Sequence, residues 1–298
     1  MSIASFTFHG AHAVLTGAAS GMGEQMAHQL AARGTHLVLV DRDEARLTDV
    51  ARQIRTTHPL LTVHTEVADL ADTAGIDGLV ARILAASPQV DLLINNAGVA
   101  LGGAFTDLTK EEFDWVMAIN FQAPVDLTRG LLPALLEAPA GHVVNVSSLF
   151  GLIGPAGQSA YSSSKFAIRG FSEVLRHELA PQGIGVTTVH PGGIKTRIAE
   201  TARVAASATP EQEAQGKAIF DKLLTYPADK AAAQILRGVE RRKARVLIAA
   251  SAVVPDLLAR LFPSHYGAVL NRVIPANKPK ATVAAAEKVQ DEVVRTGT

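Results

Sequence analysis

The chain has 298 residues, a formal net charge of zero and no cysteine. Without cysteine it can form no disulfide, thiolate metal site or cysteine nucleophile, and the balanced charge gives no electrostatic reason to expect nucleic acid or an anionic membrane as partner. Its start lacks the basic and apolar regions of a signal peptide, and no uncharged apolar run reaches membrane-spanning length, so we expect a cytoplasmic protein without a membrane span.

Most of the chain predicts alternating strands and helices. Short apolar runs predict strands over residues 11–16, 35–41, 61–67, 91–95, 141–147 and 184–190. Between them, helical spacing of apolar residues predicts helices over 21–34, 44–55, 74–86 and 158–179. Residues 109–120 open a further helix, and the spacing of Thr109 and Glu112 predicts a capping box. Continuous apolar strands are typical of a parallel sheet covered on both faces, so the expected fold is a doubly wound, Rossmann-type α/β domain.

The pattern changes after Pro191. Residues 201–216 are small and polar, a helix is predicted over 228–241 and a strand over 245–249. Residues 253–274 are amphipathic but interrupted by Pro255 and Pro263, and an alanine-rich tail follows. We expect one domain over residues 1–250 with a substrate-loop insertion at about 195–226, and a helical extension over 251–298 packed on the same domain.

A glycine-rich turn follows the first predicted strand. In "TGAASGMG", Gly17, Gly21 and Gly23 permit a tight turn that lets the backbone approach a pyrophosphate at the start of the next helix. Asp41 ends the second strand twenty residues after Gly21, where a carboxylate can bind adenosine ribose hydroxyls. The alternative is a surface aspartate that caps the next helix. A carboxylate here repels a 2′-phosphate and favours NAD, but Arg42 could bind that phosphate, so NADP stays possible.

Two Tyr–Lys pairs have helical spacing, Tyr161 with Lys165 and Tyr226 with Lys230. The first pair starts a long helix after a strand that ends in two serines, and ligands bind at the carboxyl ends of such strands. The second has no such neighbour, and Pro227 follows its tyrosine, so we interpret it as a helix entry with a solvated lysine.

The first pair suits proton transfer. A free tyrosine has a pKa of about 10, and a nearby ammonium or a positive nicotinamide would lower it. Tyr161 could then take the proton of an alcohol as hydride leaves, or return it in reduction, while the Ser148 hydroxyl holds the same oxygen.

Seven motifs stand in order over residues 6–196: "TGAASGMG", Asp69-Leu70, "NNAG", Asn120, "NVSS", "YSSSK" and "HPGGIKT". Together they resemble the short-chain dehydrogenase/reductase family. The resemblance implies a catalytic tetrad in which Tyr161 is the acid/base, Lys165 binds the nicotinamide ribose and lowers the tyrosine pKa, and Asn120 anchors a water. Ser148, which stands thirteen residues before Tyr161, matches the catalytic serine, and Ser147 does not.

The resemblance also implies an NAD or NADP site, no metal, and a homodimer or homotetramer formed through two long helices. Asn95 is as well explained by bracing the sheet as by touching the cofactor. The implied cofactor contacts are Gly17, Ser20, Gly21, Met22, Gly23, Asp41, Arg42, Asp69, Leu70, Asn95, Ala97, Gly98, Tyr161, Lys165, Pro191, Gly192, Ile194 and Thr196.

The predicted substrate pocket is apolar and holds no cation for a carboxylate. We therefore expect a lipophilic secondary alcohol or ketone, and the chain resembles bacterial short-chain alcohol dehydrogenases. An NADPH-dependent carbonyl reductase and a non-catalytic dinucleotide-sensing protein remain alternatives. The predicted lining residues are Leu101, Ser148, Leu149, Phe150, Ile153, Tyr161 and Gly193.

We assign no functional site to three other features of the sequence. The ten histidines show no metal-ligand spacing. The basic run at 241–245 is interpreted as a solvated helix end rather than a nucleic-acid contact. The apolar residues of 253–274 favour a substrate lid or a subunit contact over a membrane surface.

Overall fold

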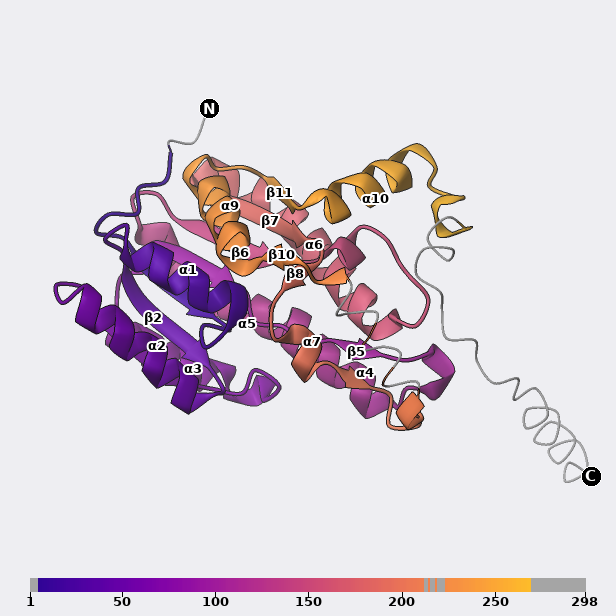
Figure 1. Ribbon diagram of the computed structural model, residues 1–298. Coiled ribbons are helices and arrows are strands. Elements are labelled where there is room, and N and C mark those ends of the chain that lie inside the picture. The colour runs from indigo at the N-terminus through magenta and orange to yellow at the C-terminus, as the bar shows by residue number, and fades with distance from the viewer. Residues whose placement is uncertain (1–4, 212–213, 215–217, 219–222, 269–298) are drawn as a thin grey trace, which may run out of the picture.

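The computed structural model describes residues 5–268, apart from 212–213, 215–217 and 219–222. Seven parallel strands form its central sheet in the order β11-β7-β6-β4-β1-β2-β3. This order confirms the predicted doubly wound α/β fold. β2 and β3 lie on one side of β1, and the later strands follow on the other side. Figure 1 labels β11, β7, β6 and β2 of this sheet. The strands are β1 His12–Thr16, β2 His36–Asp41, β3 Val63–Val67, β4 Leu92–Asn95, β6 His142–Val146, β7 Gly185–Pro191 and β11 Arg245–Ile248.

Helices cover both faces of the sheet, because successive strand residues point to opposite sides. In β1, Leu15 packs into one apolar cluster and Val14 into the other. The first cluster is completed by α1 Gly21–Ala31, α2 Glu44–Thr57 and α9 Ala228–Glu240. The second is completed by α3 Ile76–Ala86, α5 Ala123–Glu137 and α6 Ser159–Leu179.

The predicted capping box begins α4, Lys110–Met117. The Thr109 hydroxyl accepts a hydrogen bond from the Glu112 amide at 3.2 Å, and the Glu112 carboxylate accepts one from the Thr109 amide at 2.9 Å. A π-helical segment, Ala118–Gln122, then links α4 to α5. Pro124 offers a reason for it, since proline lacks the N–H that would bond the Asn120 carbonyl in an α-helix.

Two short parallel ladders hold the segments around the insertion. Strand β5 (Leu101–Gly102) pairs with β9 (Arg203–Val204), and β8 (Ile194–Lys195) pairs with β10 (Tyr226–Pro227). A short helix, α7 (Ile198–Thr201), lies between β8 and β9. The insertion predicted at about 195–226 therefore starts at β8 and ends at β10, and these two strands pair with each other.

The last described helix, α10, spans Ala250–Leu261. We expected Pro255 to interrupt it, but the helix continues through that residue. The amide that proline lacks would have bonded the carbonyl of Ser251, an exposed residue in the first turn of the helix. The helix ends before Pro263, and residues 269–298 of the predicted extension, including its alanine-rich tail, lie outside the described residues.

The basic run at 241–245 is only in part the solvated helix end that we expected. Arg242 donates to the carbonyl oxygens of Ala140 and Gly141, each at 2.8 Å, and lies 5.2 Å from the centre of the Phe6 ring. Burial lowers the pKa of Arg242 to about 10. Arg242 therefore joins the end of α9 to the loop before β6, whereas Arg241 and Lys243 of the same run are exposed.

Candidate active site

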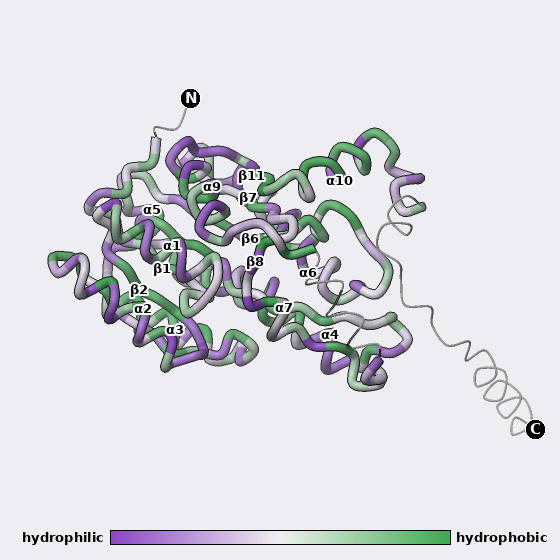
Figure 2. The backbone as a smooth tube through the Cα atoms, in the orientation of Figure 1, coloured by the Kyte–Doolittle hydropathy of each residue, from purple (hydrophilic) through white to green (hydrophobic). Residues whose placement is uncertain are grey.

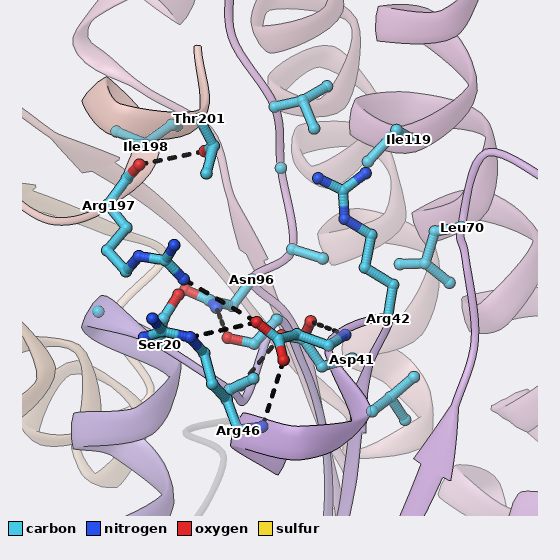
Figure 3. A pocket seen from close by; sticks show the side chains of 18 of the residues that line it. Ser20, Asp41, Arg42, Arg46, Leu70, Asn96, Ile119, Arg197, Ile198 and Thr201 are labelled. Atoms are coloured by element: carbon cyan, nitrogen blue, oxygen red, sulfur yellow. Dashed lines mark hydrogen bonds and ion pairs between the residues drawn. The ribbon is translucent and has the colours of Figure 1, made fainter.

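A pocket of about 350 Å³ opens at the carboxyl ends of the central strands (Figure 3). It gathers residues from five separate regions of the chain that the sequence marked as cofactor contacts. Those at the pocket wall are Gly17, Ser20, Gly21, Met22, Asp41, Arg42, Asp69, Leu70, Ala97, Gly98 and Thr196.

The glycine turn shapes one side of this pocket. Gly17 and Gly21 have φ angles of +67° and +57°, in the left-handed region that favours glycine. Ser20 is the N-cap of α1, but its side chain makes no cap hydrogen bond, so it leaves the amides of the first turn free to bind an anion. Gly23 does not line the pocket. A Cβ there would lie 1.9 Å from the Gly17 carbonyl oxygen, so glycine lets α1 pack against the turn.

The Asp41 carboxylate is fixed at the end of β2. It accepts hydrogen bonds from the amides of Ala19 at 3.0 Å and Asp43 at 3.1 Å. The cap of α2 is Asp43, whose side chain accepts from the Arg46 amide, so Asp41 is not the helix cap of the alternative interpretation. Asp41 instead joins the glycine turn to the pocket wall.

Three arginines also line this pocket, of which the sequence indicated one. Arg46 and Arg197 lie 3.2 and 4.0 Å from the Asp43 carboxylate. Arg42 extends separately, toward Ile119 and the side of the pocket that holds Leu70 (Figure 3). Arg197 comes from the segment after β8, and nothing in its sequence context pairs it with Asp43.

The two asparagines of the "NNAG" motif have different roles. The Asn95 amide donates to Thr128 at 3.2 Å and to Asn145 at 2.8 Å and does not reach the pocket, so it braces the sheet. Asn96 lines the pocket and donates to the carbonyls of Thr16 and Gly17 at 2.9 and 3.2 Å. Asn95 therefore has the bracing role that we weighed against a cofactor contact, and its neighbour Asn96 holds the glycine turn.

A second cavity, of about 400 Å³, adjoins the first. Both are bordered by Met22, Asn96, Gly98, Thr196 and Ile198. The predicted residues that line the second cavity are Ser148, Leu149, Phe150, Ile153, Tyr161, Lys165, Pro191, Gly192, Gly193 and Ile194. Residues that the sequence did not indicate include Gln158, Leu223, Leu224, Val254 and Pro255.

Leu101 does not line this cavity, although we expected it there. It is 1% exposed and packs with Val116 and Ala160. Ala100 faces the cavity instead, because neighbouring residues of an extended segment point to opposite sides.

The serine, the tyrosine and the lysine meet at the wall of this cavity. The Ser148 hydroxyl forms a side-chain hydrogen bond with Tyr161 and accepts one from the Phe150 amide at 3.1 Å. The Lys165 amino group lies 5.7 Å from the centre of the Tyr161 ring and donates to the Val146 carbonyl at 3.1 Å. One turn of α6 separates the tyrosine from the lysine, which places both on one face.

Ser147 and Ser148 have different roles in this arrangement. Ser147 is buried, and its hydroxyl donates to the Lys165 carbonyl at 2.8 Å, which attaches β6 to α6. Ser148 alone of the two bonds Tyr161.

Burial perturbs both titrating groups. It raises the pKa of the Tyr161 phenol, an effect that the hydrogen bond from Ser148 partly offsets. It lowers the pKa of the Lys165 amino group to about 8. Burial is thus the larger effect on the pKa of Tyr161, and the lowering by Lys165 that the resemblance implies stays a prediction.

Asn120 does not line either cavity, and both the oxygen and the nitrogen of its side chain make hydrogen bonds. Its side-chain oxygen accepts a hydrogen bond from the Val99 amide at 2.8 Å. Its side-chain nitrogen donates to the Val99 carbonyl and to the Ser164 hydroxyl, each at 3.0 Å. A Cβ on Gly98 would lie 3.2 Å from both the Asn120 side-chain oxygen and the Lys165 amino group. Asn120 therefore holds the segment after β4 close to Lys165.

A buried histidine that the sequence did not single out lies under the serine. The His190 Nδ1 donates to the Ser148 carbonyl at 3.1 Å. Burial lowers its pKa to about 4, so the ring is neutral at neutral pH. His190 thus fixes the backbone that presents the Ser148 hydroxyl.

Over residues 5–268 with their gaps, no group of three or more acidic or histidine side chains could hold a metal ion. Nor does this part of the chain contain a helix long and apolar enough to cross a bilayer.

The site can be compared with known proteins. The family model for short chain dehydrogenase matches residues 11–206. The putative oxidoreductase SadH of Mycobacterium tuberculosis is 36% identical over 264 residues, which cover 87% of this chain and 94% of that protein. Dehydrogenase/reductase SDR family member 7B of Xenopus laevis is 36% identical over 268 residues, 87% of this chain and 80% of that protein.

Solved structures are similar as well. A short-chain dehydrogenase/reductase from Burkholderia phymatum in complex with NAD has a TM-score of 0.78 and 25% identity, covering 92% of this chain and 98% of that one. A short-chain dehydrogenase from Sphingobium yanoikuyae in complex with NADPH has a TM-score of 0.70 and 27% identity, with the same coverage of 92% and 98%. With its Ser–Tyr–Lys arrangement beside a dinucleotide-type pocket, this chain belongs to the short-chain dehydrogenase/reductase family.

Proposed function

We propose that this chain transfers a hydride between NAD and a lipophilic secondary alcohol or the corresponding ketone. The observation that carries the proposal is the Ser148–Tyr161 hydrogen bond at the wall of an apolar cavity, next to a pocket suited to a dinucleotide. Solved relatives in complex with NAD or NADPH support it.

The residues of the first pocket fit a dinucleotide. The uncapped start of α1 offers amides to a pyrophosphate, and Asp41 offers carboxylate oxygens to ribose hydroxyls. The segment from Pro191 to Thr196 would hold the carboxamide end, and Lys165 the nicotinamide ribose. When bound, the nicotinamide supplies the site that accepts or donates hydride.

Tyr161 moves the proton in this scheme. Its raised pKa keeps the phenol protonated at neutral pH, so it can protonate the oxygen of a ketone during reduction. In alcohol oxidation it must lose that proton, which positive charge nearby favours. Lys165, with a pKa of about 8, is mostly charged at pH 7 and supplies part of that charge.

Ser148 and Asn120 support the transfer. The Ser148 hydroxyl would bind the same substrate oxygen as Tyr161 and stabilise the charge that develops there. Asn120, at the π-helical segment beside Lys165, is expected to hold a water through which the lysine exchanges protons.

The lining of the second cavity defines the substrate class. Of the described residues that line it, Lys165 alone is charged, and most of the others are apolar. A substrate carboxylate or phosphate would find no free cation there, whereas an alkyl or ring system would be well accommodated. Turnover of charged substrates alone would contradict this assignment.

The cofactor pocket is lined by charged side chains of both signs, which favour different cofactors. Asp41 favours NAD, because a carboxylate repels the 2′-phosphate of NADP. Arg42, Arg46 and Arg197 line the same pocket and favour the alternative, an NADPH-dependent carbonyl reductase. We expect kcat/KM to be at least tenfold higher with NADH than with NADPH, and Asp41→Ser to reduce that ratio; an NADPH preference in the unchanged chain would overturn the NAD assignment.

Exposed apolar side chains on α6 support the expected homodimer or homotetramer. Phe166 and Val174 are 41% and 56% exposed on that helix. Sedimentation velocity of the protein and of Phe166→Asp tests this expectation, since a contact through α6 predicts dissociation of the variant.

The test of the activity is absorbance of the reduced cofactor with a panel of aliphatic, aromatic and terpenoid alcohols. We expect turnover that Tyr161→Phe abolishes. Cofactor binding without turnover of any alcohol or ketone would instead favour the dinucleotide-sensing protein.

A further inference from the structure

Helix α10 exposes an apolar row of side chains that the proposed reaction does not use. Val254, Leu257 and Leu261 are 55%, 55% and 62% exposed, and we call these three residues the α10 stripe. Their spacing places them on one side of the helix. Figure 2 shows α10 as a largely hydrophobic helix at the edge of the molecule.

The opposite side of α10 is attached to the sheet by charge. Asp256 is 8% exposed and accepts hydrogen bonds from Arg245 of β11 at 2.6 and 3.1 Å. Arg260 pairs with the same carboxylate at 3.1 Å. This attachment fixes the rotation of α10 about its own axis. The α10 stripe therefore faces solvent because the helix has a defined orientation.

The stripe continues the wall of the second cavity. Val254 and Pro255 line that cavity, together with Leu149, Phe150 and Leu223. Leu257 and Leu261 follow Val254 along the same side of α10, and the helical rise places Leu261 about 10 Å beyond Val254. An apolar path therefore leads from the Tyr161 side of the cavity onto the outer surface of α10.

We propose that the α10 stripe is a subsite for an extended alkyl chain, so that the preferred substrates are secondary alcohols or ketones with a long unbranched chain. The inference rests on the proposed function, which places the reacting oxygen at Tyr161 and Ser148. From there the short end of the substrate stays inside the cavity, and the long end leaves past Val254 and lies along Leu257 and Leu261.

The test is the chain-length dependence of kcat/KM for 2-butanol, 2-hexanol, 2-octanol and 2-decanol. A methylene that is fully buried contributes about 0.8 kcal/mol, and one that keeps a side in water about half of that, or about twofold in kcat/KM. We expect kcat/KM to keep rising by about twofold per methylene up to 2-decanol. In the double variant Leu257→Gln, Leu261→Gln, the ratio of 2-decanol to 2-butanol should fall at least tenfold.

Leu60→Gln is the matched control, because Leu60 is 93% exposed on the loop between α2 and β3 and lines neither cavity. It should keep the chain-length ratio of the unchanged protein. The proposal would be overturned if kcat/KM stopped rising at 2-hexanol. It would also be overturned if the double variant left the ratio of 2-decanol to 2-butanol unchanged. A change in sedimentation of the double variant would overturn it as well, since that result assigns the stripe to a contact between copies of the chain.

Calorimetric binding of 2-butanone and 2-decanone in the presence of cofactor separates this proposal from the proposed function. If no alcohol is oxidised but 2-decanone binds more tightly than 2-butanone and loses that advantage in the double variant, the subsite stands and the activity fails. If the alcohols are oxidised without any preference for length, the activity stands and the subsite fails. Equal binding of both ketones without turnover contradicts both.

Discussion

Replacing Lys165 with methionine should make the protein more stable while it removes activity. The lysine is 3% exposed, and burial lowers its pKa to about 8 from an ordinary 10.5. The unfolded chain therefore binds this proton more tightly than the folded one, so the lysine opposes folding below pH 8 and stability rises as the pH increases from about 8 to about 10.5.

The size of the effect follows from the structure. The difference between the two pKa values corresponds to about 3 kcal/mol of folding free energy at neutral pH. Methionine removes this charge but leaves the Val146 carbonyl without its donor at 3.1 Å, which costs about 1 kcal/mol. Lys165→Met should thus raise the free energy of unfolding by about 2 kcal/mol at pH 7, and the gain should disappear near pH 11.

Urea unfolding followed by the fluorescence of Trp115, the one tryptophan of the chain, measures this gain at both pH values. On the same samples kcat should fall at least a hundredfold. Lys230→Met is the control, since this lysine is exposed and its loss should change stability by less than about 0.5 kcal/mol at either pH. A Lys165→Met protein that is no more stable at pH 7, or that keeps its gain at pH 11, would refute the reasoning.

Two further substitutions probe the glycine turn and the attachment of α10. Gly23→Ala places a Cβ 1.9 Å from the Gly17 carbonyl oxygen, so it should weaken NADH binding more than tenfold and cost about 1–3 kcal/mol; an unchanged Kd in a fluorescence titration would contradict the role of the turn. Asp256→Asn removes the charge that two arginines share, so urea unfolding should show a loss of about 2 kcal/mol at neutral pH, and a loss below about 0.5 kcal/mol would mean that α10 is held by packing alone.

The sequence predicted what depends on local pattern. Strand runs, helix periodicity and the capping box at Thr109 are encoded within a few residues, and the structure has them close to the predicted bounds. The convergence of Ser148 with Tyr161 was predictable too, because parallel strands place their carboxyl ends at one edge.

What the sequence did not predict depends on which segments meet in space. Arg197 lies near Asp43 because the segment after β8 passes beside the start of α1, where Thr196 lies next to Gly21. The stripe on α10 requires the rotation that Arg245 and Asp256 fix across two elements. The π-helical segment at Asn120 did leave a signal in the sequence, a proline four residues on, which removes one helical donor.

The sequence also could not distinguish the roles of Asn95 and Asn96. Two adjacent asparagines in an apolar strand end have the same local context, and strand alternation alone does not say which one faces the cofactor pocket. The buried partners of Asn95, Thr128 and Asn145, come from α5 and β6, so their positions decide the question.

The central claim is that Tyr161 carries the proton while hydride is exchanged. The most direct test compares Tyr161→Phe with the unchanged protein in single-turnover reduction of a lipophilic ketone by saturating NADH. Removing the phenol should slow cofactor oxidation by about a hundredfold to ten-thousandfold with the NADH Kd unchanged. A variant that oxidises NADH within tenfold of the original rate would contradict the claim, because a group other than Tyr161 would then have to supply the proton.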